Sequence, residues 1–177
     1  MTPQDIEALV ERMVVAWNGH DIPGFLQLLT EDVVWSDPGM PAPARGREAV
    51  QDFCRNILRA FPDFHYSVRR PVCVSADCLQ CAIPWRITAT HLAEMSPPGF
   101  APTGRRAELE GVDLLEFADR RVRRIESHFN PVVPAGQLLS LRLIPSPGSL
   151  GERLLVRLQR SRAWWLRSMT RPEPMEK

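Results

Sequence analysis

The chain has 177 residues, of which 44% are hydrophobic and 24% charged, a composition typical of a globular protein that buries its own core. Its 22 basic and 21 acidic side chains leave a formal charge of +1, which excludes a protein whose main role is to coat nucleic acid. The charge is uneven, because residues 142–177 hold 8 of the basic and only 3 of the acidic side chains.

Membrane insertion and metal binding receive no support from the sequence. No stretch reaches the ~20 apolar residues of a membrane span, and the N-terminus lacks the basic and apolar regions of a secretory signal. We therefore expect a cytoplasmic protein. The four cysteines are too few and too clustered for a disulfide framework. Cys78 and Cys81 have the spacing of a metal-binding pair, but no second pair follows, so we expect no metal site.

Three helices are predicted in the first third of the chain. Thr2-Pro3-Gln4-Asp5 supplies an N-cap, a first-turn proline and an acidic third residue, and apolar residues then recur at helical spacing as far as Trp17. A short second helix is expected at residues 23–29, followed by a brief strand at 32–35. A third helix is expected from Gly46 until Pro62 ends it, after a proline-rich loop at 40–45.

Four β-compatible runs follow, at residues 64–75, 79–92, 105–117 and 122–130, and turn residues separate them. Consecutive strands of this kind favour an antiparallel meander. Three leading helices and such a sheet predict an α+β fold in which the helices cover one face of a strongly bent sheet.

The tail predicts a basic amphipathic helix within residues 150–171. Its apolar positions include Leu150, Leu154, Leu158 and Trp165, and arginines mark the opposite face. We therefore divide the chain into a domain at 1–141 and a helical extension at 142–177. Two roles stay open for this helix: packing on the protein body or on a second subunit, and weak attachment to an anionic membrane surface.

Several short motifs occur in order along the first 141 residues. They are Trp17-Asn18-Gly19-His20-Asp21, Asp32-Val33-Val34-Trp35-Ser36-Asp37-Pro38, Phe61-Pro62-Asp63, Thr88-Ala89-Thr90-His91, Pro102-Thr103-Gly104-Arg105 and Gln137-Leu138. Together they resemble the SnoaL-like polyketide cyclases, a branch of the nuclear transport factor 2-like fold, over residues 4–141. The resemblance implies a cone in which a curved, mostly antiparallel sheet surrounds a deep apolar pocket closed by the N-terminal helix. It also implies a homodimer formed through the sheet.

The same resemblance implies a chemistry. Related cyclases need no cofactor, and a pocket carboxylate acts as general acid/base on a polyketide-derived substrate. Their catalytic Asp lies seven residues before the Gln-Leu pair, where this chain has Asn130. An amide can hydrogen-bond an oxygen but cannot exchange a proton at neutral pH. Another pocket group therefore takes the role, or the reaction needs orientation more than proton transfer, or the protein only binds.

Strand alternation supplies candidate site residues, because side chains two apart share a face. Counting back from Asn130 predicts His128 on the inner face. On the preceding strand, the resemblance implies that Glu116 occupies the place of a polar pocket residue, so Leu114 shares its face and Asp113 lies on the other. On the strand before, His91 shares a face with Trp85. We predict catalytic roles for Glu116, His128, Asn130 and His91. We predict substrate contacts from Trp17, Trp35, Asp37, Met40, Phe61, Trp85 and Leu114.

Functions from different classes remain open at this stage. The leading one is a cofactor-independent cyclase or isomerase of natural-product biosynthesis, with Glu116 or His128 as acid/base and Asn130 holding an enol or carbonyl oxygen of a polyketide-like molecule. The second is a ligand-binding protein of the same fold without catalysis. Epoxide hydrolysis, which uses an Asp-Arg-Asp arrangement in similar folds, is less favoured because of Asn130.

Overall fold

The computed structural model describes residues 1–96, 99–140, 145 and 147–169. The chain divides into two units, Met1–Leu141 and Arg142–Lys177. Residues 141 and 142, at the expected domain boundary, and residues 170–171 of the predicted tail helix lie outside the described residues.

The three predicted helices are confirmed as α1 (Pro3–Asn18), α2 (Ile22–Gln27) and α3 (Gly46–Ala60). α1 begins with the capping box expected from the sequence: Thr2 Oγ1 accepts the amide of Asp5 at 3.1 Å, and Asp5 Oδ2 accepts the amide of Thr2 at 2.8 Å. α2 begins at Asp21, whose Oδ1 accepts the amide of Gly24 at 2.9 Å. Local capping chemistry therefore sets the starts of α1 and α2.

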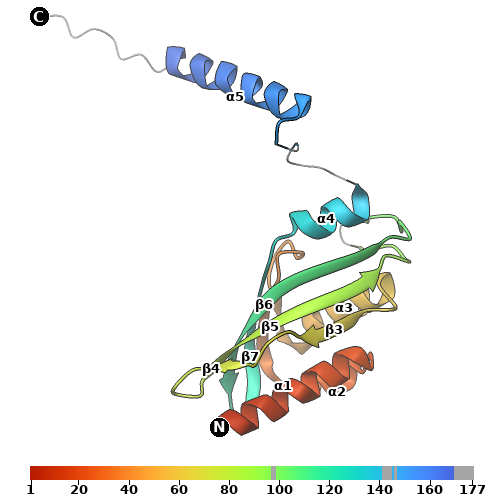
Figure 1. Cartoon of the computed structure of the whole chain (residues 1–177). Coiled ribbons are helices and arrows are strands. Elements are labelled where there is room, and N and C mark those ends of the chain that lie inside the picture. The colour runs from red at the N-terminus through yellow and green to blue at the C-terminus, as the bar shows by residue number, and fades with distance from the viewer. Residues whose placement is uncertain (97–98, 141–144, 146, 170–177) are drawn as a thin grey trace, which may run out of the picture. The chain divides into compact units, whose positions relative to one another are not determined.

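A single mixed sheet is built from β1 (Leu29–Ser36), β2 (Ala44–Arg45), β3 (His65–Val68), β4 (Cys73–Val74), β5 (Gln80–Thr90), β6 (Arg106–Ala118) and β7 (Arg121–Phe129). The strand order is β2-β1-β7-β6-β5-β3, and β4 pairs with β5 beside this path. β3, β5, β6 and β7 form the predicted antiparallel meander, while β1 pairs with β7 in parallel. The run predicted at 64–75 is two strands, β3 and β4. Figure 1 shows the long, curved β5 and β6 with the helices beside them.

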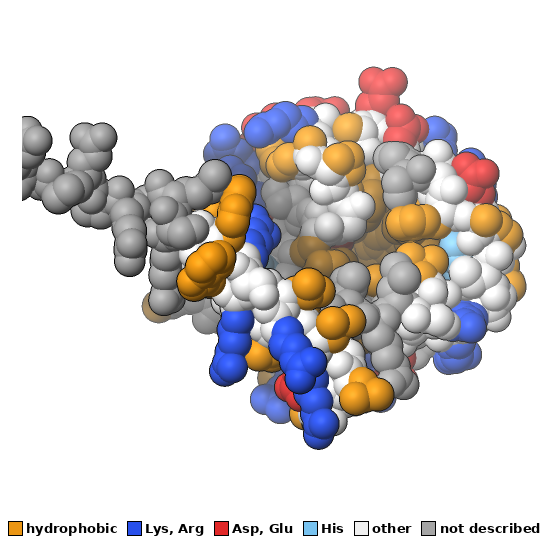
Figure 2. All heavy atoms as spheres, turned by 90° about the horizontal axis from the view of Figure 1, so that it is seen from above, with side chains coloured by type: hydrophobic (Ala, Val, Ile, Leu, Met, Phe, Trp, Pro, Cys, Tyr) orange, Lys and Arg blue, Asp and Glu red, His pale blue; other side chains and the backbone are white. Residues whose placement is uncertain are grey.

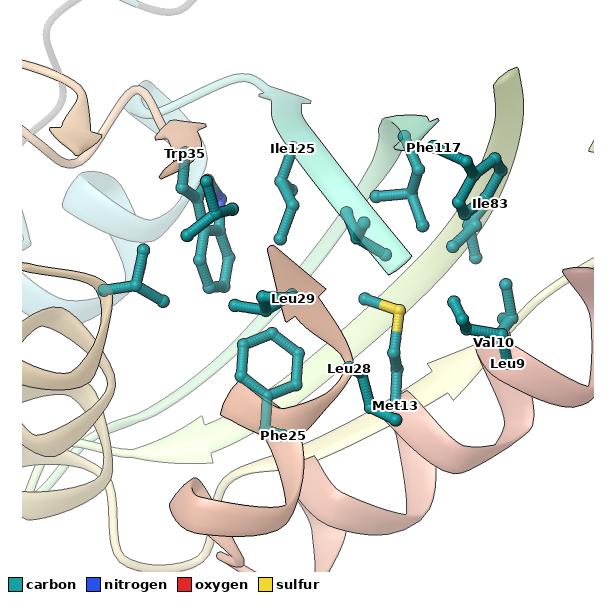
Figure 3. Close-up of a cluster of buried hydrophobic side chains, with 14 of the residues drawn as sticks. Leu9, Val10, Met13, Phe25, Leu28, Leu29, Trp35, Ile83, Phe117 and Ile125 are labelled. Carbon is teal, nitrogen blue, oxygen red and sulfur yellow. The ribbon is translucent and has the colours of Figure 1, made fainter. Parts of the chain in front are cut away.

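The core lies between the helices and the sheet, which confirms the α+β fold class. Leu9, Val10 and Met13 of α1 point toward the sheet, where Ile83 and Ile125 meet them (Figure 3). These side chains are at most 8% exposed. Burial of this apolar face stabilises the packing of α1 more than helix propensity does.

A fourth helix, α4 (Val132–Leu139), was not predicted. The Gln137 side chain holds it against β6, because its Oε1 accepts the amide of Glu108 at 2.7 Å and its Nε2 donates to the Glu108 carbonyl at 3.0 Å. Leu138 is buried beside Ala107. Pro134 and Gly136 within the segment weaken its helical signal, so tertiary contacts rather than local propensity explain α4.

The tail forms the predicted helix as α5 (Leu150–Met169). Its apolar side chains include Leu150, Leu154 and Leu158, which are 82%, 60% and 60% exposed. Arg153, Arg157 and Arg160 occupy neighbouring positions of one helical face. Within the described residues, no helix is both long enough and apolar enough to cross a membrane.

Candidate functional site

A cavity of about 750 Å³ lies inside the Met1–Leu141 unit. Side chains from α1, α3, the inner face of β5, β6 and β7, and α4 line it, and most of them are apolar. Figure 2 shows a hollow in the surface with hydrophobic side chains along its wall. The volume and the apolar lining with a few polar groups are typical of small-molecule sites.

Seven of the residues predicted from the sequence line this cavity: Trp17, Trp35, Asp37, Met40, Phe61, Trp85 and His91. Four others do not. The Glu116 carboxylate lies 3.1 Å from Arg124 Nε, and both side chains are more than 40% exposed. His128 is 61% exposed, Leu114 is 42% exposed, and Asn130 Oδ1 accepts the amide of Val132 at 3.0 Å. The prediction that these four share the cavity wall is therefore wrong.

The prediction assigned the wrong faces to β6 and β7, because the alternation was counted one residue out of step. On β6, Ala107, Leu109 and Asp113 line the cavity, so the even-numbered Leu114 and Glu116 point away from it. On β7, Ser127 and Phe129 line the cavity, so His128 points away. A slip of one residue exchanges the two faces of a strand completely. Asp113, which the sequence analysis placed on the opposite face, is the inner carboxylate.

The Asp113 carboxylate has a hydrogen-bond donor at one of its two oxygens. The Tyr66 hydroxyl donates to Asp113 Oδ2 at 3.2 Å. Oδ1 is buried and has no hydrogen-bond partner among the described residues, and the same holds for Nε1 of Trp85. Unsatisfied buried polar atoms are costly in a folded protein, so on a cavity wall these two atoms are suited to hydrogen-bond a bound molecule or water.

Burial raises the pKa of Asp113 to about 6, because the apolar surroundings disfavour its charged form. The nearby polar groups of Ser127 and Trp85 and the hydrogen bond from Tyr66 lower the pKa in part, and the nearby charge of Asp37 raises it. Burial and the negative charge of Asp113 together raise the pKa of Tyr66 far above its ordinary value, so its phenol keeps its proton. Asp113 and Tyr66 thus combine a carboxyl group whose pKa is near neutrality with a phenol that remains a hydrogen-bond donor.

Asp37 brings a second carboxyl to the same cavity. It follows β1, and its Oδ1 accepts the amide of Gly39 at 2.7 Å. Burial raises the pKa of Asp37, while hydrogen bonding to Ser127 lowers it. Ser127 Oγ also accepts the indole N–H of Trp35 at 3.1 Å. Ser127 therefore lies near both Asp37 and Asp113 in a largely apolar wall.

The backbone around the site positions its side chains. Asn18 at the end of α1 pairs with the backbone of Tyr66 through two hydrogen bonds of 2.9 and 2.8 Å. A Cβ atom on Gly111 would lie 2.4 Å from Cζ2 of Trp85, so only glycine lets this indole lie across β6. These contacts fix the Tyr66 hydroxyl and the Trp85 ring beside Asp113.

Sequence reasoning missed Tyr66, Asp113 and Ser127 as site residues. The signal for Asp113 was present, because an acidic residue interrupts the apolar run from Val112 to Leu115. Such a charge inside a strand is favourable only where something specific accommodates it. In the part of the chain that the structure describes, no three His, Cys, Asp or Glu side chains cluster as metal ligands.

Comparison with known proteins places this geometry in context. The SnoaL-like domain family matches residues 10–125. Among solved structures, AclR of Streptomyces galilaeus, a proposed hydroxylase, has a TM-score of 0.67 at 24% identity, covering 97% of this chain and all of its own. A proposed SnoaL-like polyketide cyclase from Jannaschia sp. has a TM-score of 0.68 at 17% identity, covering 78% of this chain and 93% of its own. A nuclear transport factor 2-like protein of unknown function from Burkholderia pseudomallei has a TM-score of 0.64 at 20% identity, covering 78% and 98%.

Proposed function

The chain belongs to the SnoaL-like domain family, as its motifs suggested, and we propose that it is an enzyme in which Asp113 acts as general acid/base on a polyketide-like molecule. The structural likenesses at these identities show the nuclear transport factor 2-like fold and leave the reaction open. The observation that carries the proposal is the buried Asp113 carboxyl on the wall of a large apolar cavity, with one oxygen that no described residue hydrogen-bonds.

The proposed reaction begins with proton removal from a carbon next to a carbonyl group. Asp113 Oδ1 accepts the proton, and the electron pair of the C–H bond moves to the carbonyl oxygen as an enolate. The Nε1–H group of Trp85 has no hydrogen-bond partner in the described part of the chain and is a suitable donor to that oxygen. The enolate carbon then attacks a second carbonyl, and Asp113 returns its proton to the new alkoxide. Ring closure of this kind requires no oxidant and no reductant.

The environment of Asp113 suits both proton transfers. A carboxyl with a pKa of about 6 is mostly ionised at pH 7, yet it is a stronger base than an ordinary aspartate. Asp37 strengthens this effect, because two carboxylates near one serine resist being charged together. Asn130 does not weaken the proposal, since position 130 lies outside the cavity lining.

We further propose that the enzyme catalyses a cyclase or isomerase reaction, acts in natural-product biosynthesis and is located in the cytoplasm. Deleting the gene in its native host and comparing metabolites by mass spectrometry identifies the substrate. We expect an uncyclised or unrearranged compound, isobaric with the normal product or different by one water, to accumulate. An unchanged profile while the protein is expressed supports the alternative, a ligand-binding protein without catalysis.

Purified variants then test the assignment of Asp113. We expect Asp113→Asn to lower kcat by about 10²- to 10⁴-fold, the usual contribution of a positioned acid/base. Glu116→Gln is the matched control, because it removes one carboxylate from the outer face of the same strand and should keep kcat within about twofold. Full activity of Asp113→Asn contradicts the proposal.

A further inference from the structure

His91 forms a second polar position in the same cavity. It follows β5 directly and is 1% exposed. Its ring stacks on Phe61 with centroids 5.2 Å apart and an interplanar angle of 28°. Its backbone is fixed to the loop before β6, because the His91 amide donates to the Arg105 carbonyl and the Gly104 amide donates to the His91 carbonyl, both at 2.9 Å. The orientation of the imidazole is therefore determined by its surroundings.

One ring nitrogen of His91 has a neighbour and the other has none. Nδ1 lies 3.5 Å from Thr103 Oγ1. Thr103 Oγ1 also accepts the amide of Arg105 at 3.4 Å, which leaves the hydroxyl hydrogen of Thr103 free to point at Nδ1. A neutral imidazole that accepts at Nδ1 carries its proton on Nε2. Nε2 is buried and has no hydrogen-bond partner among the described residues, so in this tautomer its N–H group can donate to a bound molecule.

The His91 end of the cavity is remote from Asp113. Asp113 lies opposite Ile83 in the pairing of β5 with β6, and His91 comes eight residues after Ile83. At about 3.3 Å per residue this is roughly 26 Å along the strand, and less across the curved sheet. The inward residues in between are apolar: Trp85, Ile87 and Ala89 on β5, and Ala107 and Leu109 on β6. Two separate clusters of the core surround the two ends.

We propose that Nε2–H of His91 binds an acceptor oxygen at the far end of an elongated, ring-containing apolar substrate whose reacting end lies at Asp113. The inference rests on the proposed function in taking this cavity as the substrate site. It makes His91 a specificity-determining residue, with Phe61 holding its ring and Thr103 setting its tautomer. Molecules of the same shape without a carbonyl, ester or ether oxygen at that end bind more weakly, because they leave Nε2 unsatisfied.

A pair of dyes provides the test. The first is propionyl-dimethylaminonaphthalene, a fused-ring ketone whose emission moves to longer wavelength when its carbonyl accepts a hydrogen bond. The second is the matched propyl analogue, in which a methylene replaces the carbonyl. We expect wild-type protein to bind the ketone about tenfold more tightly, the effect of one hydrogen bond to a buried donor. His91→Phe, which keeps the aromatic stack on Phe61, should remove this preference and leave the affinity for the propyl dye within about twofold.

Three controls keep the outcome specific. Glu116→Gln, outside the cavity, should bind both dyes like the wild type. Thr103→Val retains His91 but loses the hydroxyl, and should weaken ketone binding alone by about threefold. Nitrogen-15 chemical shifts of the histidine rings should show the Nε2–H tautomer for His91. Because dye binding involves no proton transfer, it tests His91 separately from the acid/base role of Asp113.

Each contrary result overturns the inference. Equal affinity of the wild type for the two dyes, or failure to bind either, shows that no donor in the cavity recognises an acceptor oxygen. Equal losses for both dyes in His91→Phe show that His91 only supports the fold. If that variant does not fold, an unchanged ketone preference in Thr103→Val together with the Nδ1–H tautomer has the same consequence.

Discussion

Replacing Asp113 by Asn should change how the stability of the protein depends on pH. Burial raises the pKa of Asp113 to about 6, from 3.8 for an ordinary aspartate. Over that interval the folded protein keeps a proton that the unfolded chain has lost. The stability this contributes is complete below about pH 4 and is lost as the pH rises through about 6. Asn has nearly the same shape and cannot ionise, so the variant lacks this pH dependence.

The size of the effect follows from the two pKa values. A difference of about 2 units corresponds to about 3 kcal/mol in the free energy of unfolding. Carboxylates elsewhere, including Asp5 and Asp63, have lowered pKa values and act in the opposite direction, since they stabilise the fold as the pH rises. They are the same in both proteins and cancel in the difference. We therefore expect the free energy of unfolding of Asp113→Asn to increase, relative to that of the wild type, by up to about 3 kcal/mol between pH 4 and pH 8.

Urea unfolding followed by tryptophan fluorescence at a series of pH values measures this difference. Glu116→Gln serves as the control, because the exposed Glu116 carboxylate pairs with Arg124 in water and its loss changes stability by less than about 1 kcal/mol at any pH. If the free energies of unfolding of the wild type and Asp113→Asn differ by the same amount at every pH, Asp113 ionises like a surface aspartate. That result refutes both the effect of burial on its pKa and its suitability as a base near neutral pH.

Three further substitutions give distinct results. Asp37→Asn removes a negative charge near Asp113 and should lower the pKa of Asp113, which carbon-13 carboxyl shifts report; an unmoved titration contradicts the coupling. Tyr66→Phe removes a donor to Asp113 and should raise that pKa, so the acid limb of a pH–rate profile moves to higher pH. Gly111→Ala places a Cβ atom 2.4 Å from the Trp85 ring and 2.6 Å from the His128 carbonyl oxygen and should destabilise the fold by about 1–3 kcal/mol in urea unfolding, whereas unchanged stability shows that the ring and the neighbouring strand both shift.

The elements predicted correctly are those specified by local chemistry. Thr2 and Asp5 form a reciprocal cap that any sequence reading can recognise, and the long strands β5 and β6 alternate strongly enough to be found. α4 was missed because its stability depends on Gln137 pairing with the backbone of Glu108, a contact across 29 residues. Helix propensity contains no information about such a partner.

The aromatic side of the cavity was also predictable. Trp85 lies on β5 and His91 comes directly after that strand, six positions further on, so extended backbone puts both on one face whichever face is the inner one. The motif residues Trp17, Trp35 and Phe61 are large and apolar; Trp35 and Phe61 are buried and Trp17 is half-buried, as large apolar residues usually are. Their presence in the lining needed no knowledge of how the strands pair.

The inward position of Asp113 could be predicted only with that knowledge, since Leu114 and Leu115 make both faces of β6 apolar beside it. Directly opposed residues of an antiparallel pair lie on the same face of a sheet. Asp113 is opposite Ile83, whose inward direction follows from Trp85, and Glu116 is opposite the exposed Gln80. Knowledge of one correct residue pair would thus have identified Asp113, and not Glu116, as the inward carboxylate.

Residues 91–105 connect β5 to β6, and a loop of that length does not fix a register as a two-residue turn does. The position of the carboxyl is therefore a property of strand pairing, and the absence of an aspartate at position 130 carries no weight against acid/base chemistry in this cavity.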